Sequence, residues 1–185
     1  MRIIAGKFRS LKLQTLKSNQ TRPTSGIVKE AIFSSLGSYF DGGVMLDLFA
    51  GSGAMGLEAI SRGMEFAYMA DSNPQAVKII KENVKNLKVA NQTLIWQLDF
   101  ISVLKKCLAL NLKFDLIYLD PPYQKYQADQ LLEMIATFDL LKPGGRLVLE
   151  SGKDAIFKDS YAIMKKTKVK SYGKTQVTFF QKGSR

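Results

Sequence analysis

Four consecutive residues, Asp120-Pro121-Pro122-Tyr123, place an acid, two prolines and an aromatic ring directly after the apolar run 114–119. A proline holds φ near about −65° and has no N–H, so this turn is stiff and its carbonyls are free to accept hydrogen bonds. The Asp120 carboxylate and the Pro121 carbonyl could accept both N–H groups of an exocyclic amine while its planar base stacks on Tyr123. This is the chemistry of a site that methylates an amino group. The alternative is a tight loop with a capping acid.

A second candidate site lies upstream, where an apolar segment containing Asp47 leads into the pattern Gly51-x-Gly53-x-x-Gly56. Glycines let the backbone approach a ligand and adopt positive φ. With Asp71 about 20 residues after the first glycine, the spacing is also that of a dinucleotide-binding turn, so a nicotinamide oxidoreductase is one interpretation. Asp47 favours another ligand, because a carboxylate attracts the ammonium of an amino acid and repels pyrophosphate. S-adenosylmethionine satisfies both acids, with Asp47 toward its ammonium and Asp71 toward its ribose hydroxyls.

At these residues the chain resembles the class I S-adenosylmethionine-dependent methyltransferases, and among them the RsmD-type enzymes that methylate N2 of a guanine in 16S ribosomal RNA. The resemblance spans nearly the whole chain. It is carried by segments 2–9, 22–24, 28–33, 47–53, 99–100 and 120–123, together with Asp71. One departure is Ser25-Gly26-Ile27, which stands where the family usually carries a more polar stretch, often with an acid.

The resemblance implies roles for individual residues. It assigns the methionine end of the cofactor to Asp47, Gly51 and Gly53, the ribose hydroxyls to Asp71, and the adenine to Asp99 and Phe100. It assigns the target base to Asp120 and Tyr123, with the Pro121 carbonyl as a further acceptor. Taken by themselves, Asp99 is equally a helix N-cap and Phe100 equally a core residue.

Other interpretations stay open at this point. A DNA-adenine or protein-glutamine methyltransferase of the same fold would use a similar aromatic turn, usually with Asn in place of Asp120. From another class, the chain could be an RNA-binding module with a vestigial cofactor pocket. Binding of S-adenosylhomocysteine rather than NAD would separate the methyltransferases from an oxidoreductase.

The composition excludes several classes of site. The chain has 185 residues, 46% of them hydrophobic, which is enough for one compact enzyme domain. It contains no histidine, the usual general base and commonest metal ligand, so we expect no metal. Its one cysteine, Cys107, cannot form an internal disulfide and lies in an apolar stretch without a histidine to activate it. With no apolar run of 18 residues and no apolar signal core, we expect a soluble cytoplasmic monomer.

The formal net charge of +11 is concentrated at the two ends of the chain. Residues 1–29 carry seven basic residues and no acid, and residues 151–185 carry nine basic and two acidic ones. Basic flanks of this kind favour a polyanionic partner bound through its phosphates, here 16S rRNA or a small-subunit assembly particle. The RNA contacts expected from these flanks are Arg2, Lys7, Arg9, Arg22 and Lys174. The alternative is that the lysines only promote solubility.

The hydrophobic pattern predicts the elements that must position these residues. Residues 2–5 and 10–13 read as a small basic hairpin, and we expect an N-terminal extension over 1–23 followed by a methyltransferase domain over 24–185. Helices are expected near 27–36, 54–62, 74–87, 100–109 and 127–137, and strands near 44–48, 66–70, 93–97, 114–119, 146–150, 161–168 and 175–181. Such alternation implies an α/β, Rossmann-like fold with a mostly parallel sheet covered by helices on both faces. The resemblance implies seven strands that end in an antiparallel hairpin. Asp47, Asp71, Asp99 and Asp120 all follow or end strands, where ligands bind in such sheets.

Overall fold

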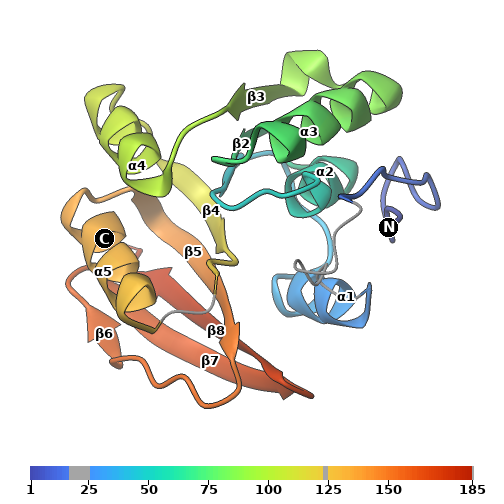
Figure 1. Cartoon of the computed structure of the whole chain (residues 1–185). Coiled ribbons are helices and arrows are strands. Elements are labelled where there is room, and N and C mark those ends of the chain that lie inside the picture. The colour runs from blue at the N-terminus through green and yellow to red at the C-terminus, as the bar shows by residue number, and fades with distance from the viewer. Residues whose placement is uncertain (17–25, 123–124, 185) are drawn as a thin grey trace. The chain divides into compact units, whose positions relative to one another are not determined.

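The computed structural model describes residues 1–16, 26–122 and 125–184 (Figure 1), which form two compact units, residues 1–100 and 101–185. Arg22 and Tyr123 lie outside the described residues. The boundary predicted at residue 23 stays a prediction. In the part of the chain that is described, no helix is both long enough and apolar enough to cross a membrane.

The first unit is built around three parallel strands in the order β3-β2-β1. They are β1 (Val44–Asp47), β2 (Phe66–Ala70) and β3 (Thr93–Trp96). Helix α2 (Ala54–Ser61) packs on β1 and β2, and α3 (Pro74–Leu87) packs on β3 (Figure 1). The unit also contains α1 (Gly26–Ser35) and the short 3-10 helix η1 (Ala90–Gln92). The helix η1 was not predicted, and the bounds of the other elements lie within one residue of the predicted ones.

Helix α3 shows why the local sequence predicts its element so well. The Asn73 side chain accepts a hydrogen bond from the Gln75 N–H, and Pro74 occupies the first helical position, where its missing N–H costs nothing. Its apolar residues recur at helical spacing and are buried: Ala76, Val77, Ile80, Val84 and Leu87. The helix ends at Lys88, whose φ of 57° is left-handed.

The N-terminal segment forms a hairpin-like loop rather than the two predicted strands. Arg2 and Lys12 form a single antiparallel bridge. Gly6 has a φ of +81°, and a Cβ at this position would lie 1.7 Å from the Ser61 carbonyl oxygen, so only glycine fits against the end of α2. Further along, the Gln14 N–H donates to Asn83 of α3 at 2.8 Å. Residues 1–16 are thereby fastened to the first unit.

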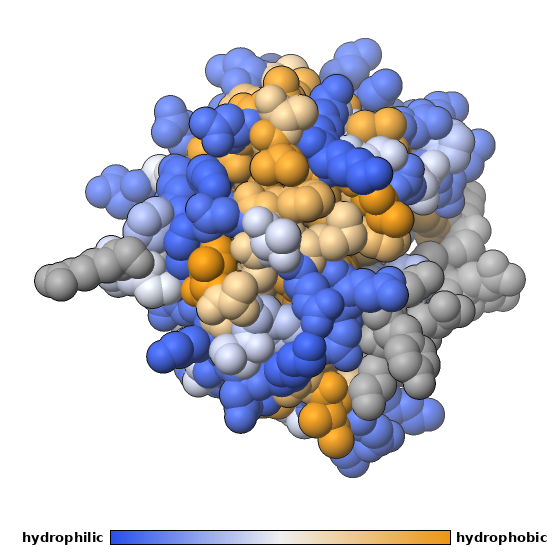
Figure 2. All heavy atoms as spheres, turned by 90° about the vertical axis from the view of Figure 1, so that its left-hand side faces the viewer, coloured by the Kyte–Doolittle hydropathy of each residue, from blue (hydrophilic) through white to orange (hydrophobic). Residues whose placement is uncertain are grey.

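The second unit contains five strands in the order β4-β5-β8-β7-β6. β4 (Phe114–Leu119) and β5 (Leu141–Gly152) are parallel. β6 (Ser160–Tyr161), β7 (Met164–Tyr172) and β8 (Thr175–Lys182) pair in antiparallel fashion, so the predicted terminal hairpin is confirmed. The helices are α5 (Lys125–Thr137) and, from Ile101 onward, α4 (Phe100–Ala109). Apolar residues gather on the face shown in Figure 2, and α4 exposes Ile101 and Leu108.

Two further predictions of strand structure were wrong. The described residues form eight strands, not seven, because Ala162 adopts a φ of 44° and folds the predicted strand 161–168 back on itself as β6 and β7. The strand predicted near 146–150 begins earlier, because residues 141–145 also lie inside β5. There the pairing register shifts between Phe114–Leu141 and Leu116–Arg146, so a bulge absorbs the proline and the glycines.

Candidate cofactor and nucleic-acid sites

The glycine turn after β1 is braced by two acids of the first unit. The Asp71 carboxylate accepts hydrogen bonds from the Gly51 N–H at 2.8 Å and from the Asn73 N–H at 2.9 Å, so it joins the turn to the start of α3. Asp47 accepts a hydrogen bond from the Gly56 N–H at 3.0 Å. Gly51 and Gly53 have φ of 56° and 76°, and a Cβ on Gly51 would meet no atom within 4 Å. The turn therefore leaves room for a ligand beside its backbone.

Asp47 is 1% exposed, so it lies beneath the turn rather than on its surface. Its Oδ2 atom is bonded to Gly56, whereas its buried Oδ1 atom has no hydrogen-bond partner among the described residues. Burial raises the pKa of Asp47 to about 7. The hydrogen bond from the Gly56 N–H lowers this pKa, and the negative charge of Asp71 raises it by a smaller amount. A buried carboxylate without a cation is unfavourable, so this position favours a positively charged group nearby.

The raised pKa of Asp47 gives a stability prediction with a definite sign. Between its unfolded pKa of 3.8 and its folded pKa of about 7, the folded protein binds the extra proton, so the stability from this group falls as pH rises. Asp47→Asn keeps an acceptor for Gly56 but cannot ionise. Relative to the wild type, the free energy of unfolding of the variant should rise by about 1.4 kcal/mol per pH unit in this window. Over the whole window the difference should reach about 4 kcal/mol.

Urea unfolding at pH 5 and pH 8 measures this difference. Asp115→Asn is the matched control, because Asp115 is paired with Lys142 at a partly exposed position. A stability difference between Asp47→Asn and the wild type that is the same at both pH values would contradict the burial of an ionisable Asp47.

The residues predicted to hold adenine lie where β3 passes into α4. Asp99 is exposed and Phe100 is half-buried. The Phe100 ring packs on Phe49, with 5.9 Å between the ring centroids, and Phe49 is itself half-buried beside the glycine turn. Phe49 was missed in the sequence, although its place between Asp47 and Gly51 was a signal. The pair presents aromatic surface next to the turn.

The target-base turn belongs to the second unit. Asp120 is half-buried, Pro121 is buried, and Tyr123 lies outside the described residues. Two residues before Asp120, the buried Tyr118 hydroxyl donates a hydrogen bond to the buried Glu150 carboxylate, which holds the end of β4 against β5. Sequence reasoning did not find this pair, because it joins residues from two strands.

A third missed feature is a buried ionic cluster in the first unit that joins the hairpin, α1 and α2. Glu58 is fully buried, and its carboxylate oxygens form ion pairs with the side-chain nitrogens of Lys29 and Arg62, each at 2.8 Å. It also accepts the N–H groups of Ile4 at 2.9 Å and Ala5 at 3.0 Å. Burial alone would raise the pKa of Glu58, but Lys29 and the other donors outweigh it and lower that pKa.

The residues predicted to meet RNA lie at the surface wherever the structure describes them. Four of the five named ones, Arg2, Lys7, Arg9 and Lys174, are exposed, and Arg22 lies outside the described residues. The positive charge that the two flanks expose is nevertheless smaller than their number of basic residues suggests, because some of these residues form ion pairs with acids. Lys29 is fully buried against Glu58. In the C-terminal flank three lysines are paired with acids: Lys158 with Glu133, Lys166 with Asp159 and Lys182 with Asp139.

Cys107 is buried, which raises the pKa of its thiol to about 12 and disfavours the reactive thiolate.

Comparison with known proteins identifies the family. The model of the family described as conserved hypothetical protein 95 matches residues 1–181. The chain belongs to this family. A putative rRNA methyltransferase of Bacillus subtilis is 35% identical over 182 residues, covering 98% of this chain and 99% of that protein. The ribosomal RNA small subunit methyltransferase D of Haemophilus influenzae is 34% identical over 161 residues, covering 83% of this chain and 80% of that protein.

Solved structures of proteins similar in sequence to this chain share its fold. A conserved hypothetical protein of Streptococcus pyogenes is 35% identical, with a TM-score of 0.76 over 84% of this chain and 95% of that one. A putative methylase of Haemophilus influenzae is 28% identical, with a TM-score of 0.82 over 98% of each chain. The predicted resemblance to RsmD-type methyltransferases and the Rossmann-like class I methyltransferase fold are confirmed. The glycine turn is therefore that of a methyltransferase fold.

Proposed function

We propose that this protein transfers a methyl group from S-adenosylmethionine to the exocyclic N2 of a guanine in 16S ribosomal RNA. The observation that carries the proposal is the acid-braced glycine turn of the first unit, in a family whose relatives include proteins named as rRNA methyltransferases.

The residues of the turn fit this cofactor. The unpartnered Oδ1 atom of Asp47 suits an ammonium or sulfonium charge, and the open space beside Gly51 admits a ligand close to the backbone. Asp71, held by two backbone N–H groups, keeps lone pairs for ribose hydroxyls. Phe100, backed by Phe49, offers a face for adenine, and Asp99 an acceptor for its amino group. When bound, S-adenosylmethionine supplies a methyl group already activated by its positive sulfur.

The turn after β4 receives the target base. Guanine N2 shares its lone pair with the ring, so the nitrogen must lose part of this conjugation before it attacks. Asp120 and the Pro121 carbonyl favour that change by accepting both N–H groups, and Asp120 takes the released proton. Correct orientation of two reactants is worth roughly 7–11 kcal/mol of the barrier. Unstacking the base costs a few kcal/mol, and stacking on Tyr123 offsets about 1–3 kcal/mol of that cost.

The exposed basic residues of the N-terminal segment and the β7–β8 turn bind the phosphate backbone. Residues 1–23 form an RNA-binding extension of a cytoplasmic, monomeric enzyme. The substrate is 16S rRNA, either free or in a small-subunit assembly particle. A nucleotide in a loop is a less costly target than a paired one, because less stacking must be broken.

Transfer of a radiolabelled methyl group tests the proposal. The purified protein should label undermodified 16S rRNA, alone or in particles, and leave duplex DNA and protein unlabelled. Digestion of the RNA to nucleosides should place the label in N2-methylguanosine. Label in N6-methyladenine of DNA or in a glutamine amide would replace this substrate with the alternative one, and binding of NAD but not S-adenosylhomocysteine would reject a methyltransferase.

A further inference from the structure

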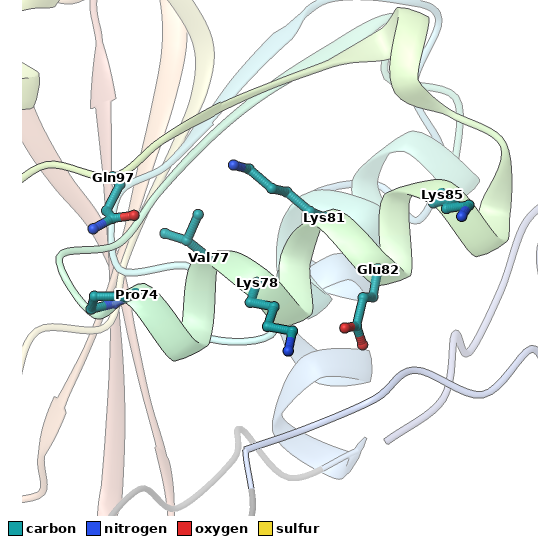
Figure 3. Close-up of a pocket in the computed structure, with 7 residues that line it drawn as sticks. All are labelled: Pro74, Val77, Lys78, Lys81, Glu82, Lys85 and Gln97. Atoms are coloured by element: carbon teal, nitrogen blue, oxygen red, sulfur yellow. The ribbon is translucent and has the colours of Figure 1, made fainter.

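The outer face of α3 carries a basic recess of about 320 Å³. It is lined by Pro74, Val77, Lys78, Lys81, Glu82, Lys85 and Gln97, whose side chains are drawn in Figure 3. Every lining residue belongs to the first unit. This recess is absent from the sequence prediction, which assigned positive charge only to the two flanks.

The three lysines form one row along the helix. At 3.6 residues per turn, Lys78, Lys81 and Lys85 fall within an arc of about 60° and span about 10 Å of the axis. Figure 3 shows them along one stretch of α3, with Lys78 and Glu82 extending to one side of the helix and Lys81 to the other. All three are exposed. With a single carboxylate among them, the row keeps a net positive charge.

These lysines differ from many others in the protein because their charge is not neutralised internally. Within the described residues, the side chain of none of the three makes an ion pair or a hydrogen bond. In the second unit, by contrast, Lys113, Lys142 and Lys158 each pair with a carboxylate at 2.8 Å or less. The α3 row is thus available to an external anion without breaking an internal contact.

The rest of the lining adds chemistry that a solvated helix face lacks. Pro74 supplies an exposed apolar surface at the N-terminal end of the row, and the buried Val77 lies at the base of the recess. Gln97, just after β3, supplies an exposed side-chain amide that can both donate and accept hydrogen bonds. This apolar surface, the amide and the lysines suit a nucleotide, with its base or sugar against Pro74 and its phosphates on the lysines.

We infer that this recess binds a single-stranded segment of the RNA substrate away from the methylated guanine. The inference rests on the proposed function, because it assumes an RNA substrate. Charge complementarity selects this occupant, since the row carries unneutralised cations and the proposed substrate carries one anion per nucleotide. The recess would then extend the RNA footprint beyond the basic hairpin and the β7–β8 turn.

The test compares two triple variants that lose the same formal charge. Lys78→Gln, Lys81→Gln and Lys85→Gln together remove the α3 row, whereas Lys113→Gln, Lys142→Gln and Lys158→Gln remove lysines already paired with acids. Fluorescence anisotropy with labelled 16S rRNA fragments, repeated from 50 to 300 mM salt, gives Kd and its salt dependence for each. The Kd for S-adenosylhomocysteine shows that each variant is folded.

The α3 triple variant should bind RNA roughly 10- to 100-fold more weakly at 0.1 M salt. Its plot of log affinity against log salt should be flatter by about 2, since each lost phosphate contact to a single strand removes about 0.7 from the slope. The control should stay within about twofold of the wild type. Gln97→Ala should weaken binding several-fold and leave the slope unchanged, because it removes no charge.

Each of the following results would overturn the inference. Equal RNA affinity and slope in the α3 variant and the control would show that the row is only a solvated face. Weaker binding of S-adenosylhomocysteine with unchanged RNA affinity would assign the recess to the cofactor instead. A wild-type protein that neither binds nor methylates rRNA would remove the proposed function and the inference together. A wild-type protein that methylates rRNA, with an α3 triple variant whose salt slope is unaltered, would remove the inference alone.

Discussion

Replacing Glu58 by alanine should lower the free energy of unfolding by about 3–5 kcal/mol, because it leaves buried charges without a partner. Lys29 is fully buried and Arg62 is 2% exposed, and Glu58 is the carboxylate that contacts both. The Ile4 and Ala5 N–H groups would lose their acceptor in the same step. Since domains are stable by only about 5–15 kcal/mol, the loss is a large share of the total.

Chemical denaturation followed by circular dichroism measures this effect. Glu30→Ala is the matched control, because Glu30 also contacts Arg62 at 2.9 Å but is 47% exposed, and pairs of that kind contribute about 1 kcal/mol or less. The N-terminal segment should also become susceptible to proteases in the Glu58 variant, since two of its backbone contacts end at this carboxylate.

If Glu58→Ala does not fold at all, a double variant keeps the prediction testable. Replacing the buried pair with apolar residues, Lys29→Met with Glu58→Leu, removes both charges at once and should recover part of the lost stability. A Glu58→Ala protein that unfolds within 1 kcal/mol of the wild type would show that the cluster does not hold the hairpin, α1 and α2 together.

The second large effect is expected on catalysis. Asp120→Ala should reduce kcat for rRNA methylation by about 10²- to 10⁴-fold, the usual contribution of a positioned proton acceptor. The reduction should appear in kcat more than in KM, because the acceptor acts on an amine that changes geometry in the transition state. Asp120→Asn should retain more activity than Asp120→Ala, since its amide oxygen still accepts one N–H.

The control for Asp120 lies on the same strand. Asp115 is at the other end of β4, paired with Lys142 at 2.7 Å, and Asp115→Ala should leave kcat within about twofold. The Kd for S-adenosylhomocysteine should be unchanged in both variants. Near-normal turnover by Asp120→Ala with intact cofactor binding would remove Asp120 from the reaction and leave the family's activity in place.

The sequence by itself predicted most of the helices and strands closely. Strand and helix bounds in the first unit follow from local signals, such as the Asn73-Pro74 start of α3 and the apolar spacing behind it. Acids at strand ends are also a local property. Since neighbouring parallel strands end at one edge, Asp47 and Asp71 meet the same glycine turn once β1 and β2 pair in register.

Only the tertiary structure decided which charged side chains are exposed and which are buried or neutralised by ion pairs. Lys29 counts as a basic flank residue in the sequence, yet it is buried on Glu58, and Asp47, predicted to meet the cofactor's ammonium, is buried beneath the glycine turn. The lysines of α3 lie in a segment of the chain with net negative charge, yet they remain unneutralised. The physical reason is that periodicity reports short-range order along one element, whereas burial and ion pairing join residues far apart in the chain, such as Ile4 and Glu58.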